Sequence, residues 1–234
     1  MRSVWRTVGR DLAADAALVA AAIGVVGLAF GAIAVGSGLP LWLPAALSLL
    51  VFAGASQFVF IGILTAGGGP LGALAAALAV NSRHLPFGFA VSDALGSGWR
   101  RYVGAHLMID ETVAFTIAQQ DPARRRAVYW TLGVGLFATW NIGVLAGSLA
   151  GTAIGDTAAF GLDAAFPAML LALVRPSLRE RRMATAAVLG ACVALASAPV
   201  LPSGMPVLAA LLALLVVPAG TPRAAVPGVV GESR

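Results

Sequence analysis

Four groups of polar side chains interrupt apolar stretches of this 234-residue chain and are the candidates for chemistry. The first, LLVFAGASQFVFIGIL at residues 49–64, has Gly54, Ser56 and Gln57 near its centre. If a helix breaks here and restarts near Ser56, its freed amide groups carry a partial positive charge that can meet an anion. The alternative is a continuous helix in which Gly54 and Ser56 serve close packing against a neighbouring helix. Both interpretations stay open at this point.

Asn81, Arg83 and His84 form the second group, in the stretch NSRHLPFG at residues 81–88. Arg83 either lies at the end of a membrane span, with its side chain reaching the lipid headgroups, or lines a cavity and holds a carboxylate. Ionisable side chains inside apolar segments usually face a cavity or a charged partner. We favour the cavity, because the next group supplies acids that can pair with Arg83.

Asp110 and Glu111 are adjacent in the third group, HLMIDETVAF at residues 106–115. Successive residues of a helix point about 100° apart, so one carboxylate can face a cavity while the other faces a second helix. A carboxylate in such a site can titrate near neutral pH, which predicts a proton-coupling role. The alternative is a structural ion pair between Arg83 and one of the two acids.

The fourth polar group and a pattern of small residues lie in the second half of the chain. GLDAAFP, residues 161–167, places Asp163 between a glycine and a proline, which repeats the logic of the first group without residue-level similarity. Two interrupted segments in separate halves can indicate a binding site at the membrane midplane. Small residues at four-residue spacing, among them Gly143, Gly147 and Gly151, predict close helix packing.

The elements that position these groups are expected to be membrane helices. Hydrophobic residues make up 59 % of the chain and charged residues 11 %, whereas about a quarter of a soluble domain is charged. Mean hydropathy is +0.92. Such a chain cannot cover a water-facing surface, so we predict an all-α, polytopic membrane helical bundle with helices broken near the midplane.

Six apolar segments reach the roughly 20 residues that a spanning helix needs: 16–36, 42–66, 70–91, 127–150, 157–174 and 183–201. Two others, 106–120 and 205–218, are short and predict tilted, partial or re-entrant passes. The connectors leave no room for a soluble domain, so residues 1–218 are expected to form one integral-membrane transporter domain. Residues 219–234 contain no apolar run and are expected to be disordered.

Arginine predicts the orientation, because basic residues near span ends stay in the cytoplasm and the chain has no lysine. If all eight segments cross and the N-terminus is cytoplasmic, twelve arginines lie inside; Arg100 and Arg101 lie outside, and Arg83 lies within a span. The basic start, MRSVWRTVGR, precedes an apolar stretch longer than that of a cleaved signal peptide. We therefore predict a multi-pass protein with an uncleaved first span and a cytoplasmic N-terminus.

Other chemistries find little support. One cysteine and two histidines give no spacing for zinc, iron–sulfur or haem sites, so no metal or cofactor is expected. An enzyme would need a serine within hydrogen-bond reach of a base, but Ser82 and His84 diverge on a helix, so none is expected. Arginines beside an anionic membrane leaflet explain the pI of about 10.9 without nucleic acid, and membrane lipid is an expected partner.

Taken together, FAGASQFVFIGIL, NSRHLPFGF, IDETVAF and GLDAAFPAMLLALV, in this order and spacing, resemble the AzlC family over about residues 15–175. The family's members are large subunits of bacterial branched-chain amino-acid exporters, inner-membrane permeases that work with a small hydrophobic AzlD subunit. The resemblance implies export of leucine, isoleucine, valine and sometimes methionine. Pro86 and Phe87 depart from the family's pattern, in which a larger aliphatic residue or a tyrosine is frequent. Roles are implied only for the matching residues Gly54, Ser56, Gln57, Asn81, Arg83, His84, Asp110, Glu111, Gly161, Asp163 and Pro167.

The resemblance and the residue chemistry lead to one expected mechanism. The substrate carboxylate would meet the helix restart at Ser56 and Gln57 together with Arg83, and its ammonium would meet Asp110 or Glu111. The apolar side chain would lie against Phe58, Phe60 or Phe87. Protonation of one acid would weaken the ammonium site and couple export to the proton gradient. The alternatives are a carrier or channel for another small zwitterion, and a membrane scaffold whose glycines bind a partner.

Overall fold

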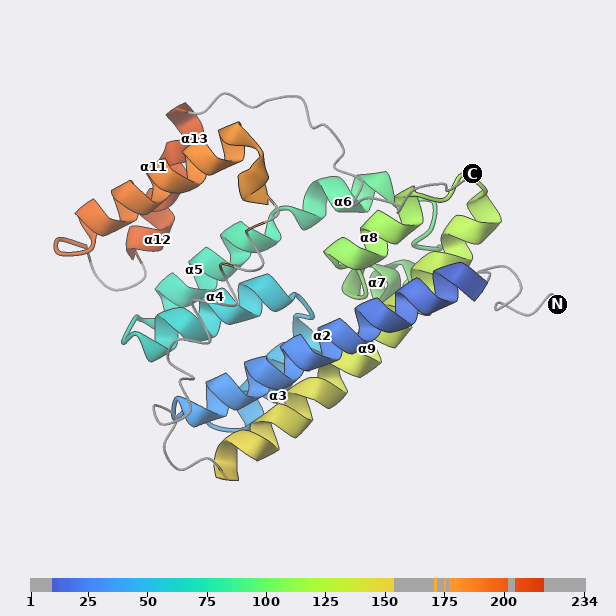
Figure 1. Ribbon diagram of the computed structural model, residues 1–234, viewed down its shortest axis with the longest axis horizontal. Coiled ribbons are helices and arrows are strands. Elements are labelled where there is room, and N and C mark those ends of the chain that lie inside the picture. The colour runs from blue at the N-terminus through green and yellow to red at the C-terminus, as the bar shows by residue number, and fades with distance from the viewer. Residues whose placement is uncertain (1–9, 154–170, 172–174, 176, 202–204, 217–234) are drawn as a thin grey trace.

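The computed structural model describes residues 10–153, 171, 175, 177–201 and 205–216. These residues form helices and connecting turns with no strand among them, as the predicted all-α class requires. The predicted span 157–174, with Asp163, lies outside the described residues apart from residue 171, and so does the tail 219–234. Figure 1 shows two long helices side by side, α2 and α9, with shorter helices beside them.

The long helices α2 (Arg10–Gly36) and α9 (Pro122–Ala153) run parallel to each other. Within the described residues, they are the two helices long and apolar enough to cross a membrane. The predicted count of six spans is therefore not confirmed.

The end of the molecule at which α2 and α9 both begin is called the starting end, and the opposite end is called the finishing end.

The predicted packing glycines lie against α2. A Cβ atom on Gly143 would overlap the backbone of Gly24, one on Gly147 would overlap the carbonyl of Leu28, and one on Gly151 would lie 2.9 Å from the Ala32 oxygen. Only hydrogen fits at these positions, so the two backbones approach closely over much of their length.

Gly147→Leu should destabilise the protein by about 3 kcal/mol, because any side chain at this position forces α2 and α9 apart. Gly135→Ala is the matched control on the same helix, since a Cβ at Gly135 meets nothing within 4 Å. Thermal unfolding of the purified variants measures the difference. Equal melting temperatures for the two variants would contradict this account of the packing.

The predicted span 42–66 forms two helices, α3 (Trp42–Leu50) and α4 (Gly54–Thr65). Phe52 lies in the turn between them with a φ of 38°, in the left-handed region that bulky residues rarely adopt. The helix is therefore broken, as the first interpretation of this segment predicted. The restart is at Gly54, however, and not at Ser56.

Ser56 and Gln57 stabilise this break. Ser56 Oγ donates a hydrogen bond to the Ala53 carbonyl at 2.9 Å, and Gln57 Nε2 donates one to the Leu47 carbonyl at 2.8 Å. Both side chains are only 1 % exposed. The Leu47 carbonyl also accepts a backbone hydrogen bond from Val51, and the Ala53 carbonyl accepts one from Gln57. The Gln57 side chain thus links α4 to the last turn of α3.

Helices α3 and α4 form a hairpin, hairpin A, that enters from the finishing end and turns back at the middle of α9. The turn residue Phe52 lies with its ring centre 5.0 Å from that of Phe137, the midpoint of α9. One turn into α4, the Phe58 ring lies 5.1 Å from Phe30 of α2. Phe30 is nearer the finishing end, because its neighbour Gly31 packs against Val144.

Helices α7 (Trp99–His106) and α8 (Asp110–Ile117) form the second hairpin, hairpin B, which enters from the starting end. At its tip, the His106 ring lies 5.5 Å from Phe137. Arg125, near the start of α9, contacts the carbonyls of Thr116 and Gln119 at 3.4 Å, where the returning helix ends. Each eight-residue helix is about 12 Å long, too short for a hydrocarbon core of about 30 Å.

This return corrects the predicted placement of Arg100 and Arg101. If residues 106–120 crossed the membrane, the two arginines would lie on the opposite side from Arg124–Arg126. Arg100 and Arg126 instead line one cleft of about 500 Å³ at the starting end. Arg100 therefore lies at the same end of the molecule as Arg126.

An ion pair at the starting end ties the turn before hairpin B to α9. Arg125 Nε and Nη2 donate to the Asp93 carboxylate at 2.8 and 3.0 Å. These hydrogen bonds hold the pKa of Asp93 below its ordinary value of 3.8. Because the pKa is lowered in the folded protein, the pair stabilises the fold above the unfolded-state pKa, and this stability is lost as pH falls through the folded-state pKa.

Acidification from about pH 6 to about pH 3 should therefore lower the melting temperature of the wild type more than that of Arg125→Gln. For a pair this exposed, we expect a difference of up to about 3 °C. Melting curves at several pH values measure it. Parallel curves for the two proteins would show that the pair contributes no pH dependence.

Between the hairpins, the predicted span 70–91 is interrupted at Arg83, which lies between α5 (Pro70–Asn81) and α6 (His84–Ala90). The remaining described elements follow α9 in sequence. They are η2 (Ser177–Arg179), α11 (Arg181–Ser197), α12 (Met205–Ala209), η3 (Ala210–Leu212) and α13 (Ala213–Val216). They pack mainly on one another, with a contact from α12 to α5.

Candidate functional site

The two hairpin tips and the break at Arg83 enclose a cavity of about 450 Å³, which we call the central cavity. Its ionisable lining residues are Arg83, His84, Asp110 and Glu111. Three chain breaks that are far apart in sequence thus supply its polar wall. The structure therefore brings together most of the second and third polar groups that the sequence singled out.

The first polar group reaches the cavity through its backbone. Ala53, Gly54 and Ala55, at the start of α4, line the wall. The first backbone hydrogen bond of this helix is donated by Gln57 to the Ala53 carbonyl, so the N–H groups of residues 54–56 have no acceptor within the helix. Such a helix start favours an anionic group.

Hairpin B contributes a second helix start. Ile109 and the first residues of α8 line the cavity. Thr112 holds this turn: its Oγ1 accepts a hydrogen bond from the Ile109 amide at 2.8 Å and lies 2.7 Å from the Ile109 carbonyl. Asp110 and Glu111 lie in the first turn of α8, whereas the first turn of α4 contains no acidic residue. The cavity therefore has one helix start without acids and one with them.

Arg83 and Asp110 form an ion pair, with Nη1 2.9 Å from Oδ2. The two side chains are 37 % and 41 % exposed. Arg83 Nε and Asp110 Oδ1 are buried and make no hydrogen bond with other described residues. The ion pair that the sequence left as an alternative therefore exists, and it stands on the cavity wall with one donor and one acceptor unused.

Glu111 and His84 complete the polar wall. Glu111 makes no ion pair with another described residue, in contrast to its neighbour Asp110. The His84 ring is positioned by an Nδ1 contact of 3.1 Å with the Asn81 carbonyl and by an edge-to-face contact with Phe87. His84 also lines a second cleft, which extends between α6 and α7 to Ser92 and Arg101. The second cleft thus shares His84 with the central cavity.

The opposite wall is apolar. Val19, Ile23 and Val26 of α2 line it together with Phe58 and Trp140. Trp140 is 3 % exposed, and its Nε1 donor is buried without a hydrogen-bond partner among the described residues. A Cβ on Gly54 would lie 3.2 Å from the Trp140 ring. The cavity is thus bounded by charge on one side and hydrocarbon on the other.

Some predicted site residues lie elsewhere. Ser56, Gln57 and Asn81 are not among the residues that line the cavity; the first two support the break instead, and Asn81 Oδ1 is buried without a partner among the described residues. Of the predicted phenylalanines, Phe58 lines the cavity, whereas Phe60 and Phe87 do not. Asp163, Gly161 and Pro167 lie outside the described residues.

Sequence reasoning missed Trp140, Phe52 and the α2 residues of the apolar wall. Trp140 precedes Asn141, a polar residue within an apolar helix, and Asn141 accepts a hydrogen bond of 2.6 Å from Ser48 of hairpin A. Asn141 was therefore the one sequence feature that could have indicated a contact between this part of α9 and hairpin A. The α2 residues gave no signal, because they look like any lipid-facing aliphatic side chain.

A family model described as "AzlC protein" matches residues 19–154, more than half of the chain. The chain therefore belongs to the AzlC family. Two proteins named "Uncharacterized membrane protein", from Helicobacter pylori strains 26695 and J99, are each 28 % identical to it over 131 residues. That region covers 55 % of this chain and 58 % of each relative. No solved structure matches significantly. With these relatives and its apolar helices, the chain is a membrane protein of the AzlC family.

Proposed function

We propose that this protein is an inner-membrane permease that exports branched-chain amino acids and couples export to the proton gradient. One observation carries the proposal: a cavity that places an Arg83–Asp110 pair and an acid-free helix start opposite an apolar wall. A branched-chain amino acid presents the same three features, a carboxylate, an ammonium and an aliphatic side chain. The family resemblance supports the direction of transport and the substrate class.

The substrate would lie with its carboxylate at the start of α4 and its ammonium toward Asp110 and Glu111. Both side chains are more than one-third exposed, so the accessible parts of the Arg83 guanidinium and the Asp110 carboxylate can meet the two charged groups without breaking the ion pair. The side chain would lie between Phe58, Trp140 and α2. A volume of about 450 Å³ lies within the usual range for small-molecule pockets, roughly 300–1,000 Å³.

The proposed membrane placement follows from the two hairpins. Hairpins that enter from opposite ends are re-entrant segments, and non-helical backbone at membrane depth is tolerated only where protein or a water-filled cavity surrounds it. α2, the interrupted α5–α6, α9 and α11 would then span the bilayer. The starting end, which carries most of the described arginines outside α11, would face the cytoplasm.

In this orientation, the cleft from Arg101 to His84 gives cytoplasmic substrate a route to the central cavity. A small hydrophobic AzlD-type subunit is the proposed partner, in keeping with the family. Membrane lipid is a second expected partner.

Gly54→Val tests the binding site. A branched side chain at this position presses on the Trp140 ring and covers the start of α4, so the affinity for leucine should fall by about tenfold or more. Gly69→Val is the matched control, because a Cβ at Gly69 meets nothing within 4 Å and the residue lies outside the cavity. Binding of labelled leucine to purified protein measures both. Equal affinity for leucine in the two variants would contradict the site.

A further inference from the structure

The cleft at the starting end is a second feature with a specific chemistry, separate from the central cavity. It is lined by Gly96, Ser97, Trp99, Arg100, Val103, Arg126 and Trp130, which come from hairpin B, the turn before it and α9. No acidic side chain is among these residues. The carboxylate of Asp93, whose backbone carbonyl contacts Arg126, is already bound to Arg125 through two hydrogen bonds.

Both arginines of the cleft keep most of their donors for a ligand. Arg126 Nη2 makes one contact with the protein, to the Asp93 carbonyl at 3.3 Å. The Arg100 guanidinium lies 6.0 Å from the centre of the Trp99 ring and makes no ion pair with another described residue. Trp130 is fixed by a hydrogen bond of 3.1 Å from its Nε1 to the Ala94 carbonyl. The cleft therefore presents two cations between two tryptophans.

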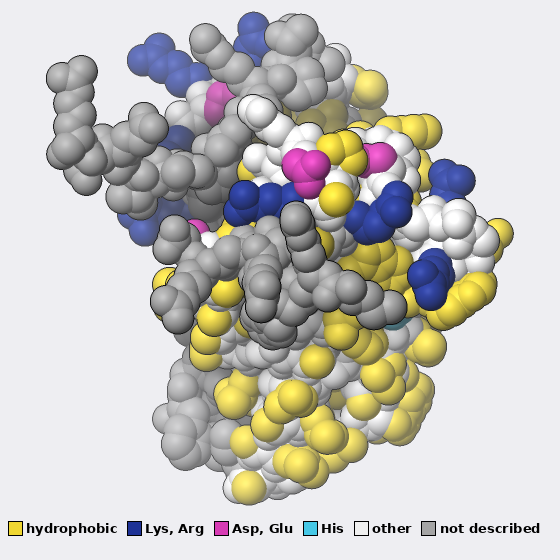
Figure 2. Space-filling view, turned by 90° about the vertical axis from the view of Figure 1, so that its right-hand side faces the viewer, with side chains coloured by type: hydrophobic (Ala, Val, Ile, Leu, Met, Phe, Trp, Pro, Cys, Tyr) yellow, Lys and Arg dark blue, Asp and Glu magenta, His cyan; other side chains and the backbone are white. Residues whose placement is uncertain are grey.

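Figure 2 looks onto this end of the molecule. Arginine side chains gather over the upper half of the view, and hydrophobic side chains cover much of the lower half. Tryptophan beside arginine at the boundary between charged and apolar surface is typical of the membrane–water interface.

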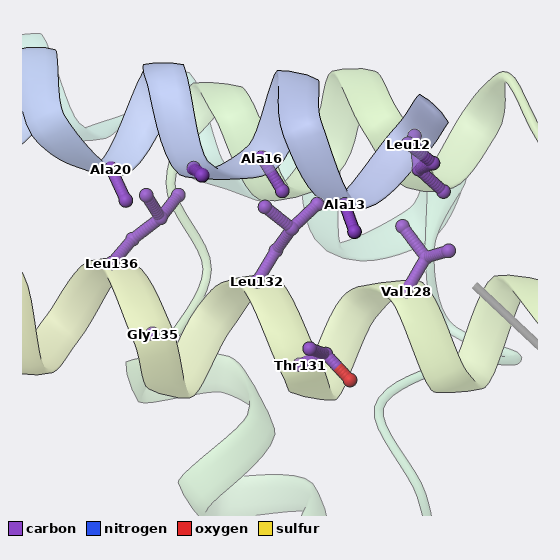
Figure 3. A pocket seen from close by; sticks show the side chains of 10 residues that line it. Leu12, Ala13, Ala16, Ala20, Val128, Thr131, Leu132, Gly135 and Leu136 are labelled. Atoms are coloured by element: carbon purple, nitrogen blue, oxygen red, sulfur yellow. The ribbon is translucent and has the colours of Figure 1, made fainter. Parts of the chain in front are cut away.

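The cleft continues into an apolar groove along α9. Arg126 and Trp130 also line the neighbouring hollow, which shares Thr131 and Gly135 with the groove between α2 and α9. Figure 3 shows Ala13, Ala16 and Ala20 of α2 facing Val128, Leu132 and Leu136 of α9. The small alanines, with Gly135, leave a depression between the helices in the first half of their length.

We propose that the cleft and the groove together bind one anionic glycerophospholipid. Its phosphate lies between Arg100 and Arg126, and one acyl chain lies along the groove between α2 and α9. A free phosphate would use the arginines and leave the groove empty, whereas a zwitterionic lipid would carry a cationic group against two arginines. Only an anionic lipid complements both parts.

The test measures lipid binding to delipidated, purified protein by native mass spectrometry, with phosphatidylglycerol and phosphatidylcholine of identical acyl chains. Wild type should bind phosphatidylglycerol about tenfold or more tightly than phosphatidylcholine. Loss of one interfacial arginine should weaken binding about fivefold, so Arg100→Gln with Arg126→Gln should weaken it about 25-fold. Arg181→Gln with Arg182→Gln removes the same charge from α11 and should leave the affinity unchanged.

Gly135→Leu tests the groove separately. A Cβ at Gly135 meets nothing within 4 Å, so a leucine can extend into the open groove and occupy the place of the acyl chain. This variant should lose phosphatidylglycerol binding about tenfold while both arginines remain. If the double arginine variant does not fold, Arg126→Gln alone should show the fivefold loss.

Three results with lipids, and one with the headgroup alone, would overturn the proposal. The first is equal affinity of wild type for the two lipids, and the second is an equal loss in the two arginine pairs. The third is unchanged lipid binding in Gly135→Leu. Tight binding of glycerophosphoglycerol, which has the same headgroup without acyl chains, would likewise show an anion site without a lipid groove.

Discussion

Glu111→Gln is expected to abolish efflux driven by the proton gradient while leaving leucine binding and leucine–leucine exchange in place. Glu111 lines the central cavity and makes no ion pair with another described residue, whereas Asp110 is held by Arg83 at 2.9 Å. Of the two acids it is therefore the one that can change protonation without breaking the pair. Glutamine keeps the shape of the side chain but cannot release a proton. Efflux against a leucine gradient should fall to the level of cells without the protein.

The matched control is Asp15→Asn, because Asp15 is an exposed acid on α2 and does not line the cavity. Exchange of external for internal labelled leucine separates the two possible defects. A variant that lacks only proton coupling loses net efflux but keeps exchange, whereas a variant that cannot bind leucine loses both net efflux and exchange. Full gradient-driven efflux of leucine in Glu111→Gln would contradict the coupling role of Glu111.

Arg83→Gln is expected to lower leucine transport by about 30-fold or more. The change removes the cation proposed to bind the substrate carboxylate and leaves Asp110 without its partner. Loss of one member of a desolvated charge pair costs about 2–5 kcal/mol, and we take the lower value because both side chains are more than one-third exposed. Arg181→Gln, at the start of α11, is the control for loss of one charge.

The double variant Arg83→Gln with Asp110→Asn separates binding from stability. If the pair were only structural, removing both charges would restore transport together with protein abundance. If Arg83 binds the carboxylate, the double variant should recover abundance, and leucine transport should stay low. Immunoblots of membrane fractions and initial rates of leucine efflux measure the two quantities.

The break in hairpin A could be predicted from sequence, because a glycine, a hydroxyl and an amide within an apolar run are costly unless the helix is interrupted. The position of the restart could not. It depends on Phe52, which adopts a left-handed backbone conformation that its residue type disfavours. Tertiary contacts determine this conformation, since the Phe52 ring packs against Phe137 on a helix that begins 70 residues later.

The charged wall of the cavity was also accessible from sequence. Arg83, Asp110 and Glu111 are ionisable groups in apolar surroundings, and such groups meet one another far more often than they meet lipid. The apolar wall could not be predicted from sequence, because aliphatic residues of α2 that face the cavity do not differ in type from those that face lipid. The return of hairpin B was among the predicted alternatives, because residues 106–120 are too short for an ordinary span. Composition alone does not distinguish a re-entrant segment from a tilted or partial pass.

The proposed export of branched-chain amino acids is tested by efflux of preloaded labelled leucine from cells that express this chain, with and without an AzlD-type subunit. We expect fast, saturable efflux for which isoleucine and valine compete, and comparison of the two strains shows whether the partner is required. Absence of leucine efflux from both strains, with the protein folded in the membrane, would contradict the assignment of the central cavity to branched-chain amino acids.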